Sequence, residues 1–347
     1  MAKQGSGRAT RADVAREAGT SVAVVSYVIN NGPRPVAKAT REKVLQAIKK
    51  TGYRPNSVAR ALASGTTKTF GLVVPNISNV FVASLAHALQ QEVLAKGQVM
   101  LLGDAGDSRQ REFELINNLL ERQVDGIIYI SVDRHPYIDL IQQTGTPLVM
   151  LDRINPGEHQ VSVLRVDERA AACQVTDHLL SHGYQQVGII SGPPEMLNAQ
   201  DRVKGWCDAM KANDLSVNEN WIFPAPYTRA GGYQATKKML MLKHAPRALF
   251  ASNELQAIGC VRALAEAGLR VPEDVALVCF NGTEQSAFHV PSLTTVRQPV
   301  VAMARAAFEM LQNWTAEPML REFAHRLEIG ESCGCFAKKS AQQQPDN

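Results

Sequence analysis

The chain has 347 residues, of which 45% are hydrophobic and 20% are charged. This length predicts two or three domains, and the composition is that of a globular protein rather than a disordered or fibrous one. No uninterrupted apolar run reaches the roughly 18–20 residues of a membrane-spanning helix. The polar, basic segment 1–11 contains no apolar signal region. We therefore expect a cytoplasmic protein.

The net charge of +4 conceals an asymmetry between two parts of the chain. Residues 1–68 contain 13 Lys and Arg against 3 acidic residues, a charge of +10, whereas the rest contains 24 against 30, a charge of −6. A small basic region attached to a mildly acidic one favours contact between the first region and a polyanion. A solvated basic arm without a partner would have the same charge, so charge alone does not decide.

Two short helices are predicted at the start of the chain. Thr10 and Asp13 have the spacing of a capping box, which begins a helix that ends at Gly19. A second helix is predicted over 22–30, with Val24, Val25 and Val28 on its buried face. Two short helices joined through a glycine turn are the layout of a helix-turn-helix, whose second helix enters the major groove of DNA.

A third helix is predicted over about 40–51. Its apolar face would consist of Val44, Leu45 and Ile48, and Gly52 would end it.

From Phe70 onwards, apolar segments of strand length alternate with segments of helical period. This alternation predicts parallel sheets covered by helices on both faces. The predicted strands lie at 71–75, 99–102, 126–130, 147–150, 187–191, 248–251, 275–280 and 326–328. The predicted helices lie at 80–96, 109–122, 168–182, 199–213, 230–242, 255–268 and 299–314. The alternation restarts at Val163, which predicts two similar α/β halves with a ligand-binding cleft at the carboxyl ends of their strands.

Motifs that carry catalysis or hold metals do not emerge from the sequence. There is no Walker loop, HExxH or GxSxG, and Gly103-Asp-Ala-Gly106 lacks the third glycine of a dinucleotide-binding turn. Cys333-Gly-Cys335 is the only close pair among the six cysteines, with neither a second CxxC nor a histidine pair near it in the chain. We expect two reduced thiols there rather than a metal site. No catalytic residue, metal or cofactor is predicted.

Several segments together resemble the LacI/GalR family of bacterial transcription regulators. They are Asp13-Val-Ala-Arg-Glu-Ala-Gly19, Ser21-Val-Ala-Val-Val-Ser26, Asn30, Thr40-Arg-Glu-Lys-Val44, Gly52-Tyr-Arg-Pro-Asn56 and Ala59-Arg-Ala-Leu62. The resemblance continues to about residue 332 and implies an α/β fold class with a small all-α headpiece. It implies a helix-turn-helix DNA-binding headpiece at 1–55, a hinge helix and linker at 56–68, a periplasmic-binding-protein-like core of two doubly wound subdomains at 69–336, and a polar tail at 337–347.

The resemblance also implies which headpiece residues contact DNA. Leu62 would wedge into a central base step of the minor groove and kink the duplex; the alternative is an ordinary apolar helix residue. Val22 and Ala23 would lie against base edges, where small apolar side chains can touch thymine methyl groups. The other expected DNA-binding residues are Thr10, Ser21, Ser26, Tyr27, Asn30, Arg34, Tyr53, Arg54, Asn56 and Arg60. Because Tyr27 stands where relatives often have arginine, we expect a shifted base preference.

A small-molecule effector, a sugar or a related metabolite, is implied for the cleft. Arg202 matches the family's Arg-x-x-Gly-aromatic motif, and its guanidinium would bind ligand hydroxyls or a carboxylate; a surface ion pair is the alternative. The other expected effector-binding residues are Phe81, Asn198, Tyr227, Asn253 and Asn281. Glu254, Asn281 and Gly282 each stand where the family more often has aspartate, and Asn281 still offers a hydrogen-bond donor and an acceptor. Loss of a carboxylate near Asn281 leaves the identity of the effector open.

Three functions were compared. A transporter's solute-binding protein would need an export signal and no basic headpiece, and an α/β enzyme would need a nucleophile–base pair. A DNA-binding regulator would need a basic headpiece, which this chain has. The salt dependence of its affinity for DNA would distinguish this function from the binding of a neutral solute. We expect a homodimer on a pseudo-palindromic operator, acting as a repressor. The tail lacks the heptads of a tetramerising bundle, and the residues do not decide whether the effector releases or tightens DNA.

Overall fold

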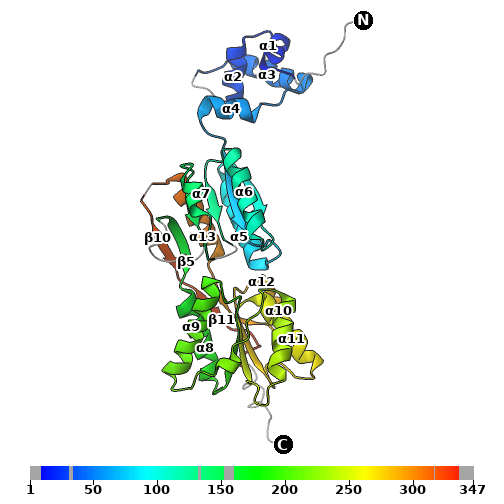
Figure 1. The fold of residues 1–347 in the computed structure, drawn as a ribbon. Coiled ribbons are helices and arrows are strands. Elements are labelled where there is room, and N and C mark those ends of the chain that lie inside the picture. The colour runs from blue at the N-terminus through cyan, green and yellow to red at the C-terminus, as the bar shows by residue number, and fades with distance from the viewer. Residues whose placement is uncertain (1–8, 31–33, 132–133, 152–159, 316, 336–347) are drawn as a thin grey trace, which may run out of the picture. The chain divides into compact units, whose positions relative to one another are not determined.

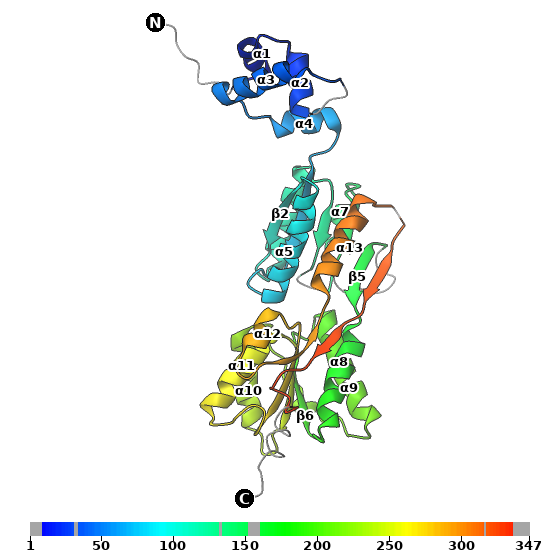
Figure 2. The same ribbon diagram turned by 180° about the vertical axis from the view of Figure 1, so that it is seen from behind.

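The computed structural model describes residues 9–30, 34–131, 134–151, 160–315 and 317–335 (Figures 1 and 2). The chain divides into two units, Met1–Thr67 and Lys68–Asn347, which we call the headpiece and the core. Within the described residues, no helix is long and apolar enough to cross a membrane. The predicted tail at 337–347 and the loop residues 31–33 lie outside the described residues.

The described residues of the headpiece contain four helices: α1 (Arg11–Ala18), α2 (Val22–Asn30), α3 (Lys38–Thr51) and α4 (Ser57–Ser64). The predicted capping box begins α1, because the Thr10 hydroxyl accepts from the Asp13 backbone N–H at 3.3 Å and the Asp13 carboxylate accepts from the Thr10 N–H at 2.9 Å. Gly19 ends this helix in the left-handed conformation, with φ of 64°.

A small apolar core holds the first three helices together. Its buried side chains come from α1, α2, α3 and the segment after α3, and they are Val14, Ala15, Val25, Val28, Val44, Ala47 and Tyr53. The prediction that Leu45 faces inward was wrong, because Leu45 is 47% exposed and Ala47 is buried instead. The buried stripe of α3 follows the i, i+3, i+4 spacing through Val44, Ala47 and Ile48, which excludes position 45. Val24 is only partly buried.

The first sheet of the core is parallel throughout, in the order β10-β5-β4-β3-β1-β2. Its strands are β1 (Thr69–Val74), β2 (Val99–Asp104), β3 (Ile127–Tyr129), β4 (Leu148–Met150), β5 (Ser162–Val166) and β10 (Leu320–Phe323). The helices α5 (Val80–Ala95) and α13 (Val300–Gln312) share one apolar cluster with this sheet. The helices α6 (Arg109–Glu121) and α7 (Ile138–Gln142) share another, so both faces are covered, as predicted.

The second sheet has the order β11-β9-β8-β7-β6 and is parallel except for β11, which runs antiparallel to β9. Its strands are β6 (Val187–Ile190), β7 (Ala248–Ala251), β8 (Ala276–Phe280), β9 (Thr294–Arg297) and β11 (Arg326–Glu328). One face packs against α8 (Glu168–Ser181) and α9 (Leu197–Ala212). The other packs against α10 (Arg229–Leu240) and α11 (Glu254–Glu266). Two short helices, η1 (Glu219–Trp221) and α12 (Glu284–Phe288), complete this half.

The predicted division of the core at Val163 was wrong. Strand β5 contains Val163 and pairs with β4 in the first sheet, and α13 and β10 return to that sheet late in the chain (Figure 2). The pattern of apolar residues identifies a strand but not the sheet that it joins, because sheet membership depends on backbone pairing over long range. The strands β9 and β10 were not predicted; β10 lies at a sheet edge with mostly exposed side chains.

We expect the core to fold without the headpiece. Of the five apolar clusters found among the described residues, one belongs to the headpiece and four belong to the core. A fragment of residues 68–347 should therefore keep cooperative thermal unfolding, within roughly 2 °C of the core transition of the full chain, since surface changes alter stability by about 0.5 kcal/mol or less. Circular dichroism checks this, and a non-cooperative unfolding curve would contradict it.

Candidate functional site

A pocket of about 420 Å³ lies between the two halves of the core. Residues within two positions of the ends of strands from both sheets line it, among them Pro75, Ser131, Leu151, Asn253 and Asn281. Ligands of open α/β sheets bind at these carboxyl ends of the strands. All predicted effector-binding residues line the pocket, namely Phe81, Asn198, Arg202, Tyr227, Asn253 and Asn281. The structure thus brings the six together, and their contact with a ligand stays a prediction.

Arg202, on α9, is fixed against the pocket wall. Its side chain is 3% exposed and its Nε donates to Glu168 Oε2 at 2.6 Å. Its Nη1 donates to the backbone oxygen of Ser252 at 2.5 Å, and the guanidinium lies over the rings of Phe280 and Tyr227, at 4.2 and 5.6 Å from their centroids. The alternative of a surface ion pair does not describe this residue, because its guanidinium is buried, while the partner carboxylate of Glu168 is partly buried.

The polar side chains beside Arg202 are also held in place. The Tyr227 hydroxyl donates to Asn198 Oδ1 at 3.0 Å. Asn253 caps α11 by accepting from the Gln256 N–H at 2.8 Å, and its amide donates to the Tyr227 backbone oxygen at 3.3 Å. These hydrogen bonds hold the side chains of the pocket wall in fixed rotamers. The side chains therefore lose less conformational entropy when a ligand binds.

Asn281 occupies the position after β8, with φ of 59°. Its Oδ1 accepts from Gln298 Nε2 at 2.6 Å. The next residue, Gly282, has no room for a side chain, because a Cβ there would lie 2.1 Å from Cγ2 of Thr295. The aspartate that relatives often carry at this point therefore does not fit this chain without a change around Thr295.

Glu254, another departure from the family pattern, is not among the residues that line the effector pocket. Its carboxylate accepts from the Thr283 N–H at 3.2 Å, from the Thr283 hydroxyl at 2.8 Å and from the Ser286 hydroxyl. The side chain is 3% exposed. The longer glutamate thus holds the loop after β8, a structural role rather than a ligand contact.

Sequence reasoning missed several charged or polar lining residues. They are Asp107, Arg165, Glu168, Glu195, Arg229 and Gln298. Glu168 lies two residues after the end of β5. Because ligands of α/β sheets bind at the carboxyl ends of the strands, this position could have indicated a pocket residue. Gln298 follows β9, which was not predicted, and no signal in the sequence pointed to it.

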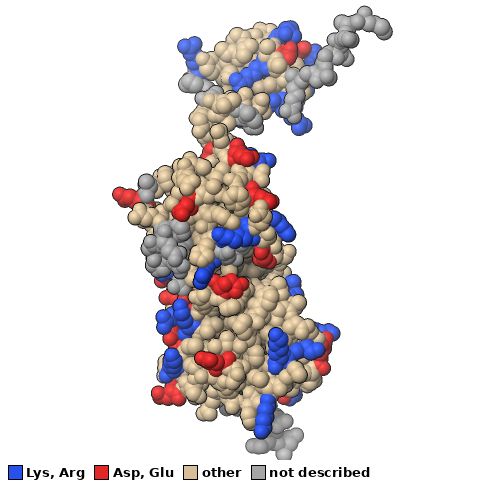
Figure 3. Space-filling model, in the orientation of Figure 1, with Lys and Arg blue, Asp and Glu red and all other residues tan. Residues whose placement is uncertain are grey.

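The headpiece presents most of its predicted DNA-binding residues at its surface. Val22 is 46% exposed and Leu62 is 83% exposed, and Ser21, Ala23, Asn30, Arg34, Arg54, Asn56 and Arg60 are exposed. The Ser21 hydroxyl accepts from the Val24 N–H at 3.3 Å at the start of α2, and the Asn30 amide donates to Ser26 at 3.3 Å. On the face seen in Figure 3, Lys and Arg dominate the charged surface of the headpiece, whereas both signs mix over the core.

Three of the predicted DNA-binding residues are buried, partly buried or hydrogen-bonded within the headpiece. Tyr53 is 8% exposed and belongs to the apolar core, and its hydroxyl accepts from Arg11 Nε at 3.2 Å. Thr10 caps α1, and Tyr27 is partly buried. Contacts of these residues with DNA stay predictions.

Comparisons with known sequences follow the same division of the chain. The family model for "Bacterial regulatory proteins, lacI family" matches residues 10–56, and that for "Periplasmic binding protein-like domain" matches residues 176–333. Catabolite control protein A of Priestia megaterium is 33% identical over 326 residues, covering 92% of this chain and 98% of its own. The HTH-type transcriptional repressor PurR of Pasteurella multocida is 31% identical over 330 residues, covering 93% and 98%.

Solved structures show the same architecture. A complex of the transcriptional regulator CelR with cellobiose has a TM-score of 0.71 and 28% identity, covering 94% of this chain and 100% of its own. The lac repressor dimer bound to operator and the anti-inducer ONPF has a TM-score of 0.82 at 24% identity, covering 94% and 99%, which supports the fold. Since relatives matched over nearly their whole length are transcriptional regulators and not enzymes, this chain belongs to the LacI family of bacterial regulatory proteins.

Proposed function

We propose that the protein is a homodimeric repressor that binds a pseudo-palindromic operator and is controlled by a sugar or a related metabolite. The observation that carries this proposal is the convergence of Arg202 and the five other predicted effector-binding residues on one pocket. We propose that the protein acts in the cytoplasm, where operator DNA lies.

The walls of the pocket support an effector with both apolar and hydrogen-bonding faces. The rings of Phe81 and Tyr227 offer surfaces for stacking, and the amides of Asn198 and Asn253 offer donors and acceptors. The volume of about 420 Å³ lies within the range of small-molecule sites. Relatives carry such ligands, since CelR was solved with cellobiose and a LacI-family regulator of Enterococcus faecium, with a TM-score of 0.68 and 26% identity, was solved with ribose.

The exposed residues of the headpiece support the operator contact. The small apolar side chains of Val22 and Ala23 begin α2, where they can meet thymine methyl groups. Arg54 and Arg60 are suited to phosphate contacts, which position the protein without reading sequence. Specificity then depends on α2 and on the wedge that we propose for Leu62.

Exposed apolar side chains along one edge of the first sheet support a dimer. Strand β2 is the edge strand, and its Val99 and Leu102 are 56% and 47% exposed, with Leu94 of the preceding helix 61% exposed. Contiguous exposed apolar surface marks interaction sites. An effector that favours one arrangement of the two core subdomains would change the spacing of the paired hinge helices, and thereby operator affinity, by the coupling of the two equilibria.

Genome-wide footprinting of the full-length protein on host DNA at near-physiological salt tests the proposal. We expect binding at a few pseudo-palindromic sites. The logarithm of the binding constant should fall linearly with the logarithm of the salt concentration. Adding sugars and nucleobases in turn should change occupancy for one chemical class. Uniform coating of DNA, or an occupancy that no metabolite changes, would contradict the proposal.

A further inference from the structure

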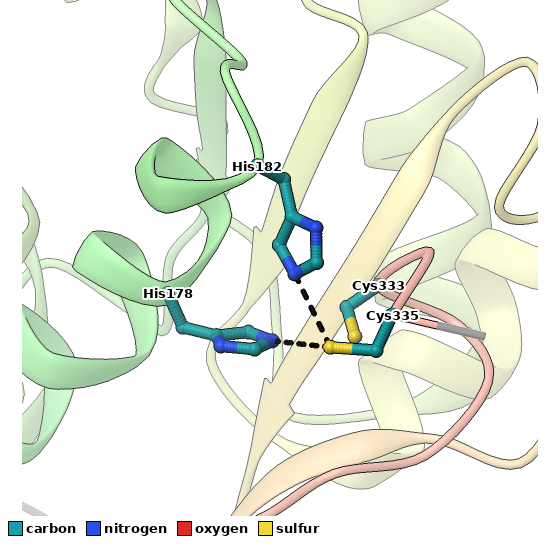
Figure 4. Close-up of side chains that lie close together, drawn as sticks. All are labelled: His178, His182, Cys333 and Cys335. Carbon is teal, nitrogen blue, oxygen red and sulfur yellow. Dashed lines mark hydrogen bonds between the residues drawn. The ribbon is translucent and has the colours of Figure 1, made fainter. Parts of the chain in front are cut away.

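Two histidines and two cysteines lie close together at the C-terminal end of α8. His178 lies in the last turn of α8 and His182 follows this helix directly, whereas Cys333 and Cys335 come from the segment after β11 (Figure 4). Cys335 and His178 are 157 positions apart in the chain. One potential ligand atom from each residue can be chosen such that all four lie within 4.8 Å of one another.

The local sequence on each side of this cluster explains why the side chains converge. Positions 178 and 182 are four apart, so successive turns present both imidazoles on the same face. Their rings lie 4.9 Å apart between centroids, at an interplanar angle of 82°. Between the two cysteines, Gly334 has φ of 93°, a conformation that favours glycine. The turn at Gly334 brings both thiols to the same side (Figure 4).

Two of the six separations between the ligand atoms match those of a tetrahedral metal site. The Cys335 Sγ lies 3.3 Å from His182 Nε2 and 3.6 Å from His178 Nε2. With Zn–S of about 2.3 Å and Zn–N of about 2.0 Å, tetrahedral zinc places neighbouring sulfur and nitrogen ligands about 3.5 Å apart. Both measured separations lie within 0.2 Å of that value.

The donor set selects the kind of metal. Two sulfurs and two imidazole nitrogens in a tetrahedral arrangement suit Zn²⁺, whereas Mg²⁺ and Ca²⁺ prefer oxygen. Cys333 is fully buried in the apolar cluster of the second sheet, while the other three residues are partly exposed. An ion can thus reach the site from solvent. None of the four residues is among those that line the described effector pocket.

We propose that His178, His182, Cys333 and Cys335 form a zinc site in which the chain supplies all four ligands. The ion fastens the segment after β11 to the end of α8. A site closed by four protein ligands is structural rather than catalytic, because no position is left for substrate or water. Zinc binding then stabilises the folded core, since the unfolded chain does not hold the ligands in this geometry. This proposal is independent of the effector and operator proposals.

The full-length protein, stripped of metal by a chelator and kept reduced, provides the test. Titration with Zn²⁺ should reach one ion per chain and raise the Tm of the core by about 5–10 °C at zinc 100-fold above its dissociation constant. Co²⁺ should give the visible bands of a tetrahedral ion and a thiolate charge-transfer band. X-ray absorption of the zinc protein should show sulfur at about 2.3 Å and nitrogen at about 2.0 Å.

Variants separate this site from adventitious zinc binding. Cys335→Ser and His178→Gln replace partly exposed ligands and should weaken zinc affinity by more than about 100-fold, since changes beyond the first ligands already cost about 10–100-fold. Cys173→Ser is the matched control on α8. Burial and the neighbouring Asp177 raise the pKa of Cys173 to about 11, so its thiol stays protonated and the variant should bind zinc normally.

Several outcomes would overturn the proposal. One is a reduced protein that shows no thiolate band with Co²⁺ and no bound zinc. Another is zinc binding of equal affinity in Cys335→Ser, His178→Gln and the parent protein, which would place the ion elsewhere. A disulfide between Cys333 and Cys335 in protein isolated with its metal content intact would assign the pair to redox chemistry instead.

Discussion

Replacing Leu62 by alanine is expected to lower operator affinity by about 10²–10³-fold in the dimer. The side chain is 83% exposed on α4, and a leucine that becomes buried between base pairs gains about 0.8 kcal/mol for each buried carbon. Loss of three carbons from each of two subunits amounts to roughly 3–5 kcal/mol at full burial, of which the DNA recovers part by returning to an unkinked form. Gel-shift titration of the operator at fixed salt measures the change.

A matched variant distinguishes a wedge from a general loss of apolar surface. Leu45→Ala removes the same atoms from another exposed leucine of the headpiece, one that is 47% exposed on α3. We expect this variant to bind the operator like the parent protein. Binding of effector should be unchanged in both variants. Equal operator affinity of Leu62→Ala and the parent would rule out the wedge.

Replacing Arg202 by alanine is expected to affect both the effector response and the stability of the core. The variant leaves Glu168, whose side chain is 14% exposed, without the 2.6 Å bond from the guanidinium. Breaking a buried ion pair by removing one partner costs about 3–5 kcal/mol, which corresponds to a fall in Tm of roughly 6–20 °C. Below that temperature the variant should still bind operator, while its affinity for the effector falls at least about 100-fold.

Two further variants separate the ligand contact from the loss of stability. Arg202→Lys keeps a positive charge beside Glu168 but loses the planar fork and its stacking on Phe280. We expect its effector affinity to fall at least tenfold with a smaller loss of Tm. Arg169→Ala removes an ion pair with Asp208 that joins the same two helices, α8 and α9, at the surface, and should cost less than about 1 kcal/mol without changing effector binding. Isothermal titration and thermal unfolding give both quantities, and an effector isotherm unchanged in Arg202→Lys and Arg202→Ala would exclude a ligand contact.

Local pattern was enough to predict the headpiece and most core elements. The capping box at Thr10, the stop at Gly19 and the helix over 22–30 depend on interactions within a few residues, and the structure has all three. In the core, the strands 248–251 and 326–328 were predicted with the bounds that the structure has. The six candidate effector residues line one pocket because the carboxyl ends of parallel strands converge.

The sequence by itself determined most of the segments that form helices and strands, and through shared motifs the family of the protein, because both depend on residues close together in the chain. Only the tertiary structure decided that β5 joins the first sheet, that Arg202 is buried against Glu168, and that His178 and His182 meet Cys333 and Cys335. The two side-chain arrangements join positions between about 30 and 160 residues apart. The placement of β5 depends on which strand it pairs with. Backbone pairing and packing over such separations leave no periodic trace in either segment alone.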